Sequence, residues 1–325
     1  MSRLIVSVVL IFVSLALGYV WRRSVLAKQG SNKHLICLRD RLQFLAFFVL
    51  IPFSSMLSLW GLPTPDQRLL LFPLLGISAW TAGGILGLLF ASLAHFSRAG
   101  KGSLFCCATF SNIGAVGTLV CVVFFGEVSI AYVALYRLFE EIFYYGLAIP
   151  VATRFKGDEA CEVRVQGMRI SRLLCLVIAA LVTGLILNRL HVPRPEVLGH
   201  LSAAMSITAA VLALFSIGLG LRLSRLAGYK CACLGIVLIK FLCVPCLVTG
   251  LAYLLGFASI DAGLPIKITL LLASMPVAMN ALLPPALLSL DLDMANACWL
   301  MSTLALAIVL PVLAFFILPL LSPVL

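Results

Sequence analysis

The stretch that decides the fold reads Ser103-Leu-Phe-Cys-Cys-Ala-Thr-Phe-Ser-Asn-Ile-Gly-Ala-Val-Gly-Thr-Leu-Val-Cys-Val-Val-Phe-Phe125, an apolar segment interrupted by Asn112-Ile-Gly114-Ala-Val-Gly117. A second apolar segment, residues 266–289, is interrupted by Met275-Pro276-Val-Ala-Met-Asn280 and then by Pro284-Pro285. Glycine and proline favour breaks in helices, and in hydrocarbon an unwound backbone survives only where it lines a protected site. We therefore expect function at these two segments, which lie at matching places in the two halves of the chain.

The composition of the chain is that of a membrane protein. Hydrophobic residues make up 63% of its 325 residues, charged residues only 11%, and the mean hydropathy is +1.17. A soluble domain is about 45–50% apolar and about 25% charged, so a soluble fold is excluded. We predict an all-α membrane protein whose helices each cross roughly 30 Å of hydrocarbon at about 1.5 Å per residue. The ten predicted transmembrane helices are residues 4–21, 42–60, 69–93, 103–125, 128–152, 172–190, 201–221, 231–256, 266–289 and 294–321.

Basic residues set the expected orientation, because cytoplasmic loops of membrane proteins are enriched in lysine and arginine. Sixteen basic residues fall in the linkers after spans 1, 3, 5 and 7, and five fall on the opposite side. The sixteen are Arg22, Arg23, Lys28, Lys33, Arg39, Arg41, Arg98, Lys101, Arg154, Lys156, Arg164, Arg169, Arg172, Arg222, Arg225 and Lys230. The sequence thus predicts a multi-pass protein of the cell inner membrane or plasma membrane, with both termini non-cytoplasmic. This topology accounts for the net charge of +11 without nucleic acid as a partner.

The two halves of the chain repeat one another. The recurring motifs are Leu17-Gly18 and Thr183-Gly184 near the ends of spans 1 and 6, Ala108–Asn112 and Ala273–Val277 in spans 4 and 9, and the acidic turns Gly126-Glu127 and Asp291-Leu-Asp293. Each half has five spans, and five is odd, so the second half enters the membrane from the opposite face and the repeat is inverted. We predict a first five-helix repeat at 1–153, a cytoplasmic linker at 154–170 and a second five-helix repeat at 171–325. Chance likeness between apolar segments is the alternative.

Four of these motifs resemble the auxin efflux carrier family, which includes bacterial malonate-type permeases and plant auxin carriers. They are Gly18-Tyr-Val-Trp-Arg-Arg, Phe125-Gly126-Glu127, Asn112-x-Gly114-x-x-Gly117 and Met275-Pro276-x-Ala278-x-Asn280, in the family's order and spacing. The resemblance implies a five-plus-five inverted repeat of ten helices, in which broken helices 4 and 9 cross and hold an organic anion. The family usually has a proline two positions after the last glycine of the span 4 motif, where this chain has Leu119.

The interruptions supply the candidate substrate-binding residues Asn112, Gly114, Gly117, Pro276 and Asn280. Glycine lets the backbone approach a ligand closely, and proline removes a backbone donor and leaves an upstream carbonyl without its partner. A broken helix offers N–H groups that suit anions at one half and carbonyls that suit cations at the other. Asparagine can both donate and accept hydrogen bonds. The alternative is that these small residues only allow two helices to cross closely.

Span 5 carries charges that are costly inside a membrane. Arg137, Glu140, Glu141 and Tyr144 stand at i, i+3, i+4 and i+7, so they share one face of a regular helix. Arg137 can pair with Glu141, which leaves Glu140 to be protonated, to bind a cation or to pair with Lys240. We consider Arg137 a further candidate substrate ligand, and Glu140 and Glu141 candidate coupling groups. A static ion network that only stabilises packing is the alternative.

These features predict a secondary active transporter, a permease that moves a small organic anion across the lipid bilayer by alternating access. An ion-coupled carrier of another small solute and a channel-like component are the alternatives. We do not expect an enzyme, because no clustered ligands or nucleophiles are visible near an interface. We expect neither a metal nor a cofactor, since most of the eleven cysteines lie inside spans, where thiols behave as small hydrophobes. H+ or Na+ as coupling ion, and a homodimer, stay open.

Overall fold

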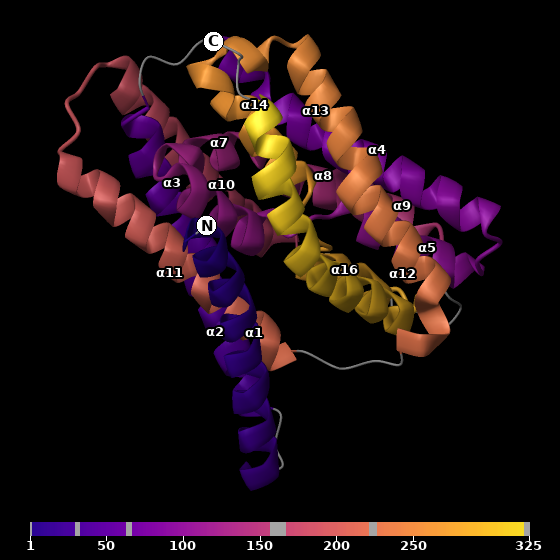
Figure 1. Cartoon of the computed structure of the whole chain (residues 1–325). Helices are drawn as coiled ribbons and strands as arrows, with labels where there is room; N and C mark the ends of the chain where they lie inside the picture. The colour runs from indigo at the N-terminus through magenta and orange to yellow at the C-terminus, as the bar shows by residue number, and fades with distance from the viewer. Residues whose placement is uncertain (1, 30–32, 63–66, 157–166, 221–225, 322–325) are drawn as a thin grey trace. The chain divides into compact units, whose positions relative to one another are not determined.

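The computed structural model describes residues 2–29, 33–62, 67–156, 167–220 and 226–321 (Figure 1). Nearly all of these residues are helical. The described residues also contain an isolated antiparallel β-bridge between two extended stretches. Residues 157–166, which make up most of the predicted cytoplasmic linker at 154–170, lie outside the described residues. The main helices are α1 (Ser2–Gln29), α2 (Lys33–Phe44), α3 (Ile51–Trp60), α4 (Phe72–Leu93), α5 (Arg98–Thr109), α6 (Thr118–Phe125), α7 (Val128–Tyr136), α8 (Glu140–Phe143), α9 (Ile149–Thr153), α10 (Gly167–Arg189), α11 (Glu196–Gly220), α12 (Lys230–Leu238), α13 (Val244–Leu254), α14 (Leu264–Ala273), α15 (Leu283–Leu287) and α16 (Leu292–Val312).

The chain is a multi-pass integral membrane protein. Within the described ranges, six continuous helical segments are long and apolar enough to cross a membrane. They are Leu4–Val25, Cys37–Trp60, Arg68–Leu93, Glu196–Gly220, Lys230–Leu254 and Leu292–Leu320, which match six of the ten predicted spans. Of the other four, spans 4, 5 and 9 are interrupted, and the apolar part of span 6 is the shorter helix Ile178–Arg189. Ten spans in an inverted repeat therefore stay a prediction.

The helices gather into two compact units. The first comprises Met1–Pro65, Gly114–Leu135 and Gln166–Arg222, and the second comprises Asp66–Ile113, Tyr136–Val165 and Leu223–Leu325. Neither unit corresponds to one half of the sequence, since each draws helices from both halves. The candidate residues are divided accordingly: Gly114 and Gly117 belong to the first unit, and all the others belong to the second.

In the first unit, glycines bring two long helices into backbone contact. α1 packs along α11, and α11 and α10 both pack against α3 (Figure 1). A Cβ atom at Gly18 would lie 2.1 Å from the carbonyl oxygen of Phe215, and one at Gly218 would lie 2.3 Å from that of Leu15. Small residues allow such close helix crossings in membranes, where lipid is as apolar as the helices and packing supplies the attraction.

Glycines play the same part in the second unit, where α4 packs on α5. A Cβ atom at Gly83 would lie 2.3 Å from the carbonyl oxygen of Ala108, and one at Gly87 would lie 2.5 Å from the Ala108 side chain. This contact fixes the C-terminal end of α5, just before the first interruption. α13 packs against both α4 and α14, and α12 packs along α16.

Several helices widen into π turns, and most of these turns precede a proline. Four of the five π turns in the described ranges end two residues before one: η1 (Leu45–Leu50) before Pro52, η4 (Tyr144–Ala148) before Pro150, η6 (Ile239–Cys243) before Pro245, and η10 (Leu313–Ile317) before Pro319. In each case the residue before the proline donates its N–H to the carbonyl five residues back. A proline ring clashes with the carbonyl four residues back, and the wider turn relieves that clash.

The fifth π turn, η3 (Ile113–Gly117), precedes Leu119 instead of a proline. The backbone at Leu119 thus already has the form that precedes proline elsewhere in the chain. We expect Leu119→Pro to be no less stable than Leu119→Ala, which loses the same buried side chain. Val122→Pro has no π turn directly before it, so it should unfold about 3 kcal/mol more easily than Val122→Ala. Thermal unfolding of the four purified variants checks this, and an equal proline penalty at both positions would contradict it.

Candidate functional site

Both interrupted helices unwind, but the first does so earlier than its glycines predict. α5 ends at Thr109, and the backbone is extended at Phe110 (φ −95°, ψ 129°) before it enters η3. Gly114 and Gly117 lie inside η3, and Gly117 has ordinary helical angles (φ −61°, ψ −46°). The prediction that these glycines form the interruption is therefore wrong, because they begin the second half-helix. Glycine permits unwinding without requiring it.

The second interruption falls where the sequence predicts it. α14 ends at Ala273, the backbone is non-helical from Met275 to Ala278, and the 3-10 turn η9 (Met279–Leu282) follows. Pro284 and Pro285 do not extend the break, because they occupy the first turn of α15. Proline is accommodated there, since the first N–H groups of a helix lack intrahelical partners.

The two unwound stretches pair with each other inside the second unit. Ser111 and Val277 form an antiparallel bridge. The N–H of Asn112 donates to the carbonyl of Pro276 at 2.7 Å, and the N–H of Ala278 donates to the carbonyl of Phe110 at 3.1 Å. Backbone groups released from two helices thus satisfy one another, as an apolar surrounding requires. We call Phe110–Asn112 together with Pro276–Ala278 the crossing.

Of the two candidate asparagines, Asn112 lies in the crossing and Asn280 follows it, and their surroundings differ. Asn112 is 8% exposed, and its side-chain amide makes no hydrogen bond to any described residue. Asn280 is exposed, and its backbone carbonyl accepts a 3.0 Å hydrogen bond from the hydroxyl of Tyr144. The Tyr144 ring also packs on Phe110, with ring centroids 4.8 Å apart. Tyr144 therefore joins both sides of the crossing, a contact that the helical spacing of span 5 did not predict.

The ion pair of span 5 differs from the predicted one. Arg137 pairs with Glu140 instead of Glu141. The reason is a break in the helix: α7 ends at Tyr136, residues 137–139 form a turn, and α8 begins at Glu140, so the i, i+4 geometry of a regular helix is absent. Glu141 lies within electrostatic range of both residues, yet no ion pair or hydrogen bond joins it to a described residue. Glu141 is thus the carboxylate that is left over.

Lys240 lies at the crossing and not beside the span 5 glutamates. It belongs to η6, is 1% exposed, and its ammonium group donates to the Ser111 hydroxyl at 2.9 Å. None of the ion pairs among the described residues includes Lys240, so the predicted alternative of a Lys240–glutamate pair is not formed. Neither Ser111 nor this contact was among the predictions from the sequence. Pro245, which follows η6, is the sequence feature that marks this turn.

The geometry of the crossing can be tested by a disulfide. In antiparallel pairs such as Ser111 and Val277, where the flanking residues carry the hydrogen bonds, the Cα atoms lie about 4.5 Å apart. A disulfide spans about 4.4–6.8 Å between Cα atoms. We expect Ser111→Cys with Val277→Cys to cross-link almost completely on mild oxidation, as measured by mass spectrometry of the linked peptides. The control, Asn112→Cys with Val277→Cys, is shifted by one residue and should stay reduced. Equal cross-linking of both pairs would contradict the bridge.

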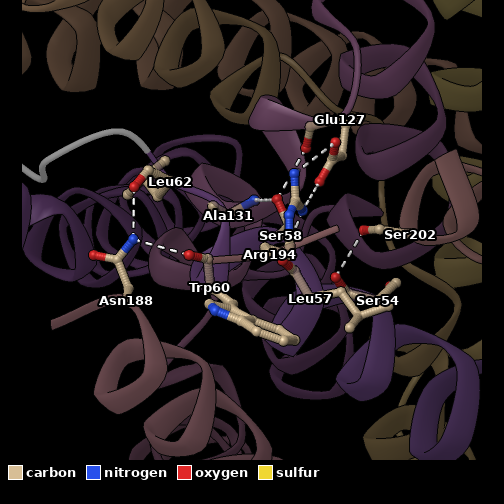
Figure 2. A network of polar contacts seen from close by, with 10 residues as sticks. All are labelled: Ser54, Leu57, Ser58, Trp60, Leu62, Glu127, Ala131, Asn188, Arg194 and Ser202. Atoms are coloured by element: carbon tan, nitrogen blue, oxygen red, sulfur yellow. Dashed lines mark hydrogen bonds and ion pairs between the residues drawn. The ribbon is translucent and has the colours of Figure 1, made fainter. Parts of the chain in front are cut away.

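A second polar network lies in the first unit, around the C-terminal end of α3 (Figure 2). The Arg194 guanidinium pairs with Glu127 and donates to the carbonyl of Leu57 at 2.8 Å. Ser58 donates to the carbonyl of Glu127 at 3.0 Å and accepts from the N–H of Ala131 at 3.1 Å. These contacts fix α3, α7 and the segment before α11 to one another.

The same network satisfies carbonyls at the end of α3 and just after it, where helical hydrogen bonds run out. Asn188 donates to the carbonyls of Trp60 and Leu62, at 3.0 and 2.6 Å, and the Trp60 indole donates to the carbonyl of Val192 at 2.8 Å. Gly61 leaves room for the guanidinium, because a Cβ atom there would lie 2.1 Å from the central carbon of Arg194. The hydrogen bonds and the ion pair drawn in Figure 2 join segments of the first unit to one another, and we do not place a ligand here.

Comparison with known proteins gives one distant relative. No family model matches this sequence. The chain is similar to an uncharacterized transporter. That protein comes from Methanothermobacter thermautotrophicus and is 25% identical over 246 residues, which cover 75% of this chain and 77% of the relative. The likeness extends over most of both chains. The resemblance to the auxin efflux carrier family stays a prediction.

Proposed function

We propose that this protein is a secondary active transporter of a small organic anion and that the crossing is its substrate site. The observation that carries the proposal is the backbone pairing of Ser111 with Val277. Two helices at matching places of the chain unwind and pair there, which is the arrangement that transporters with repeated halves use to bind a substrate near the midplane of the membrane. The auxin efflux carrier family, with its ten helices in two inverted repeats, is the membership we propose.

Partial charges at the crossing favour an anion as well as a cation. The half-helices α5 and α14 end beside the crossing, and η3 and η9 begin beside it. Helix N-termini attract carboxylates and helix C-termini attract cations. Asn112, whose amide has no partner among the described residues, can donate to a carboxylate. An organic anion at the half-helix N-termini, with H+ or Na+ as the coupling ion, fits this arrangement.

The division of the chain supports alternating access. The first unit takes predicted spans 1, 2, 6 and 7, the second takes spans 3, 8, 9 and 10, and the interrupted spans 4 and 5 are divided between the two units. Spans 1 and 6, 2 and 7, and 3 and 8, which are equivalent helices of the two predicted repeats, thus fall in the same unit. Alternating access requires two bodies that move against each other around a binding site. The two units are the bodies we propose, and the second unit holds the crossing. The relative from Methanothermobacter, itself named a transporter, supports the same class of function.

Counterflow in proteoliposomes tests the proposed function. Vesicles loaded with an unlabelled carboxylate, such as malonate, succinate or benzoate, should accumulate the same labelled carboxylate transiently above its outside concentration. A carrier exchanges internal for external substrate in this way and a channel does not. Empty vesicles and vesicles loaded with the uncharged diamide of malonate are the controls. Saturable uptake with counterflow supports a carrier of organic anions, whereas uptake without counterflow would indicate a channel.

A further inference from the structure

A lysine lies buried beside the crossing, and no acidic side chain of the described residues forms an ion pair with it. Lys240 is 1% exposed and lies in the middle of the segment Lys230–Leu254. Its ammonium group has three donors, and one of them is used by the Ser111 hydroxyl at 2.9 Å. Among the described residues, no carboxylate forms an ion pair with it. The Cys107 thiol on α5 is a titratable group within electrostatic range of Lys240.

Arg137, a half-buried cation of the second unit, already has a partner of opposite charge. Arg137 pairs with Glu140, so the net charge of that pair is zero. The C-terminal end of α5 offsets part of the Lys240 charge, but a helix end carries only ~0.5 of an elementary charge. A lone buried ammonium is costly in a membrane protein, and buried charges there are usually paired or functional. Lys240 therefore has the charge and the two remaining donors that an incoming anion needs.

We propose that Lys240 binds the carboxylate of the transported anion, and that it is the residue which selects anions over neutral solutes at the crossing. This inference rests on the proposed function. The Ser111 hydroxyl accepts a hydrogen bond from one of the three N–H groups of the ammonium. The Ser274 hydroxyl, fully buried just before the second unwound stretch, has no hydrogen-bond partner in the described part of the chain. The Lys240 ammonium group and the Ser274 hydroxyl are the donors that we assign to the two oxygens of the carboxylate.

A structural role for Lys240 makes a different prediction. If the ammonium only neutralised the end of α5, its removal would destabilise the unliganded protein. If it is kept for an anion, its removal should leave the unliganded protein equally stable or more stable, because a lone buried charge is lost. Lys240→Met removes charge and donors, whereas Lys240→Gln removes the charge and keeps a donor for Ser111. Lys267→Met is the matched control, since Lys267 belongs to the same unit and donates to Ala262 away from the crossing.

The test measures the thermal unfolding of the purified full-length protein with malonate, succinate and benzoate, with chloride as salt control and the corresponding amides as neutral analogues. Bound ligand raises the unfolding temperature by mass action. We expect at least one carboxylate, and no amide, to stabilise the wild type and Lys267→Met. In Lys240→Met and Lys240→Gln the apparent Kd should rise roughly 10- to 100-fold, the loss of one charge-assisted contact.

Each other outcome has a definite meaning. Carboxylate stabilisation that persists in both Lys240 variants would overturn the role of Lys240 and leave the proposed function standing. Loss of unliganded stability in Lys240→Gln and Lys240→Met alike would make Lys240 a structural charge and overturn the proposal. If no carboxylate stabilises the wild type and counterflow is also absent, the organic-anion function itself fails.

Discussion

Arg137→Met and Glu140→Leu, made singly, are each expected to reduce the free energy of unfolding by about 3–5 kcal/mol. The Glu140 side chain is 5% exposed and that of Arg137 is 20% exposed, so either change leaves a largely buried charge without its partner. The double variant replaces the pair with apolar groups of similar size and should recover most of the loss. Urea or thermal unfolding of the three variants, read as a double-mutant cycle, measures the coupling energy.

Glu141→Leu is the matched control for this cycle. Glu141 follows Glu140 directly but forms no ion pair with a described residue, so its replacement should leave stability unchanged or raise it. If the losses in the two single variants simply add in the double variant, the Arg137–Glu140 pair does not exist in the folded protein. Transport by the double variant then distinguishes a functional role of the pair from a structural one. A stable but inactive double variant would mark the pair as functional, and a stable and active one would mark it as structural.

The sequence alone predicted the features that depend on composition and on local helix breakers. A helical membrane protein follows from the hydrophobic content, and the break at Met275–Ala278 follows from Pro276, which cannot donate to a helix. Four π turns also have a local cause in the prolines that follow them. A proline alone does not predict such a turn, because Pro311 lies inside α16 with no π turn before it.

Features that depend on distant contacts were not predicted. The first break lies at Phe110–Asn112, before the glycines, because Ser111 pairs with Val277, a residue 166 positions further along the chain. Arg137 pairs with Glu140 because the helix breaks at residues 137–139, and no glycine or proline marks that break. In both cases tertiary contact decided among local conformations that the sequence left open. The Lys240–Ser111 contact depends in turn on the pairing of Ser111 with Val277, because that pairing places Ser111 in the crossing.

Asn112→Leu is expected to abolish transport without unfolding the protein. Asn112 lies in the crossing, and its N–H makes the 2.7 Å bond to Pro276, which leucine keeps. Its side-chain amide has no partner in the described residues, so leucine removes no hydrogen bond from the fold and only the donor and acceptor offered to a substrate. Asn280→Leu, on the exposed side of the crossing, should act in the same direction. Asn296→Leu is the matched control, because Asn296 lies on α16 outside the crossing.

Counterflow of a transported carboxylate by the Asn112→Leu protein is the most direct test of the crossing as the substrate site. The variant should unfold at the wild-type temperature. Its rate of exchange should be at least about 100-fold lower than that of the wild type, because positioned polar contacts to the substrate are lost. Asn296→Leu should exchange at the wild-type rate. Wild-type exchange by both Asn112→Leu and Asn280→Leu would contradict the account and leave the crossing as a packing feature.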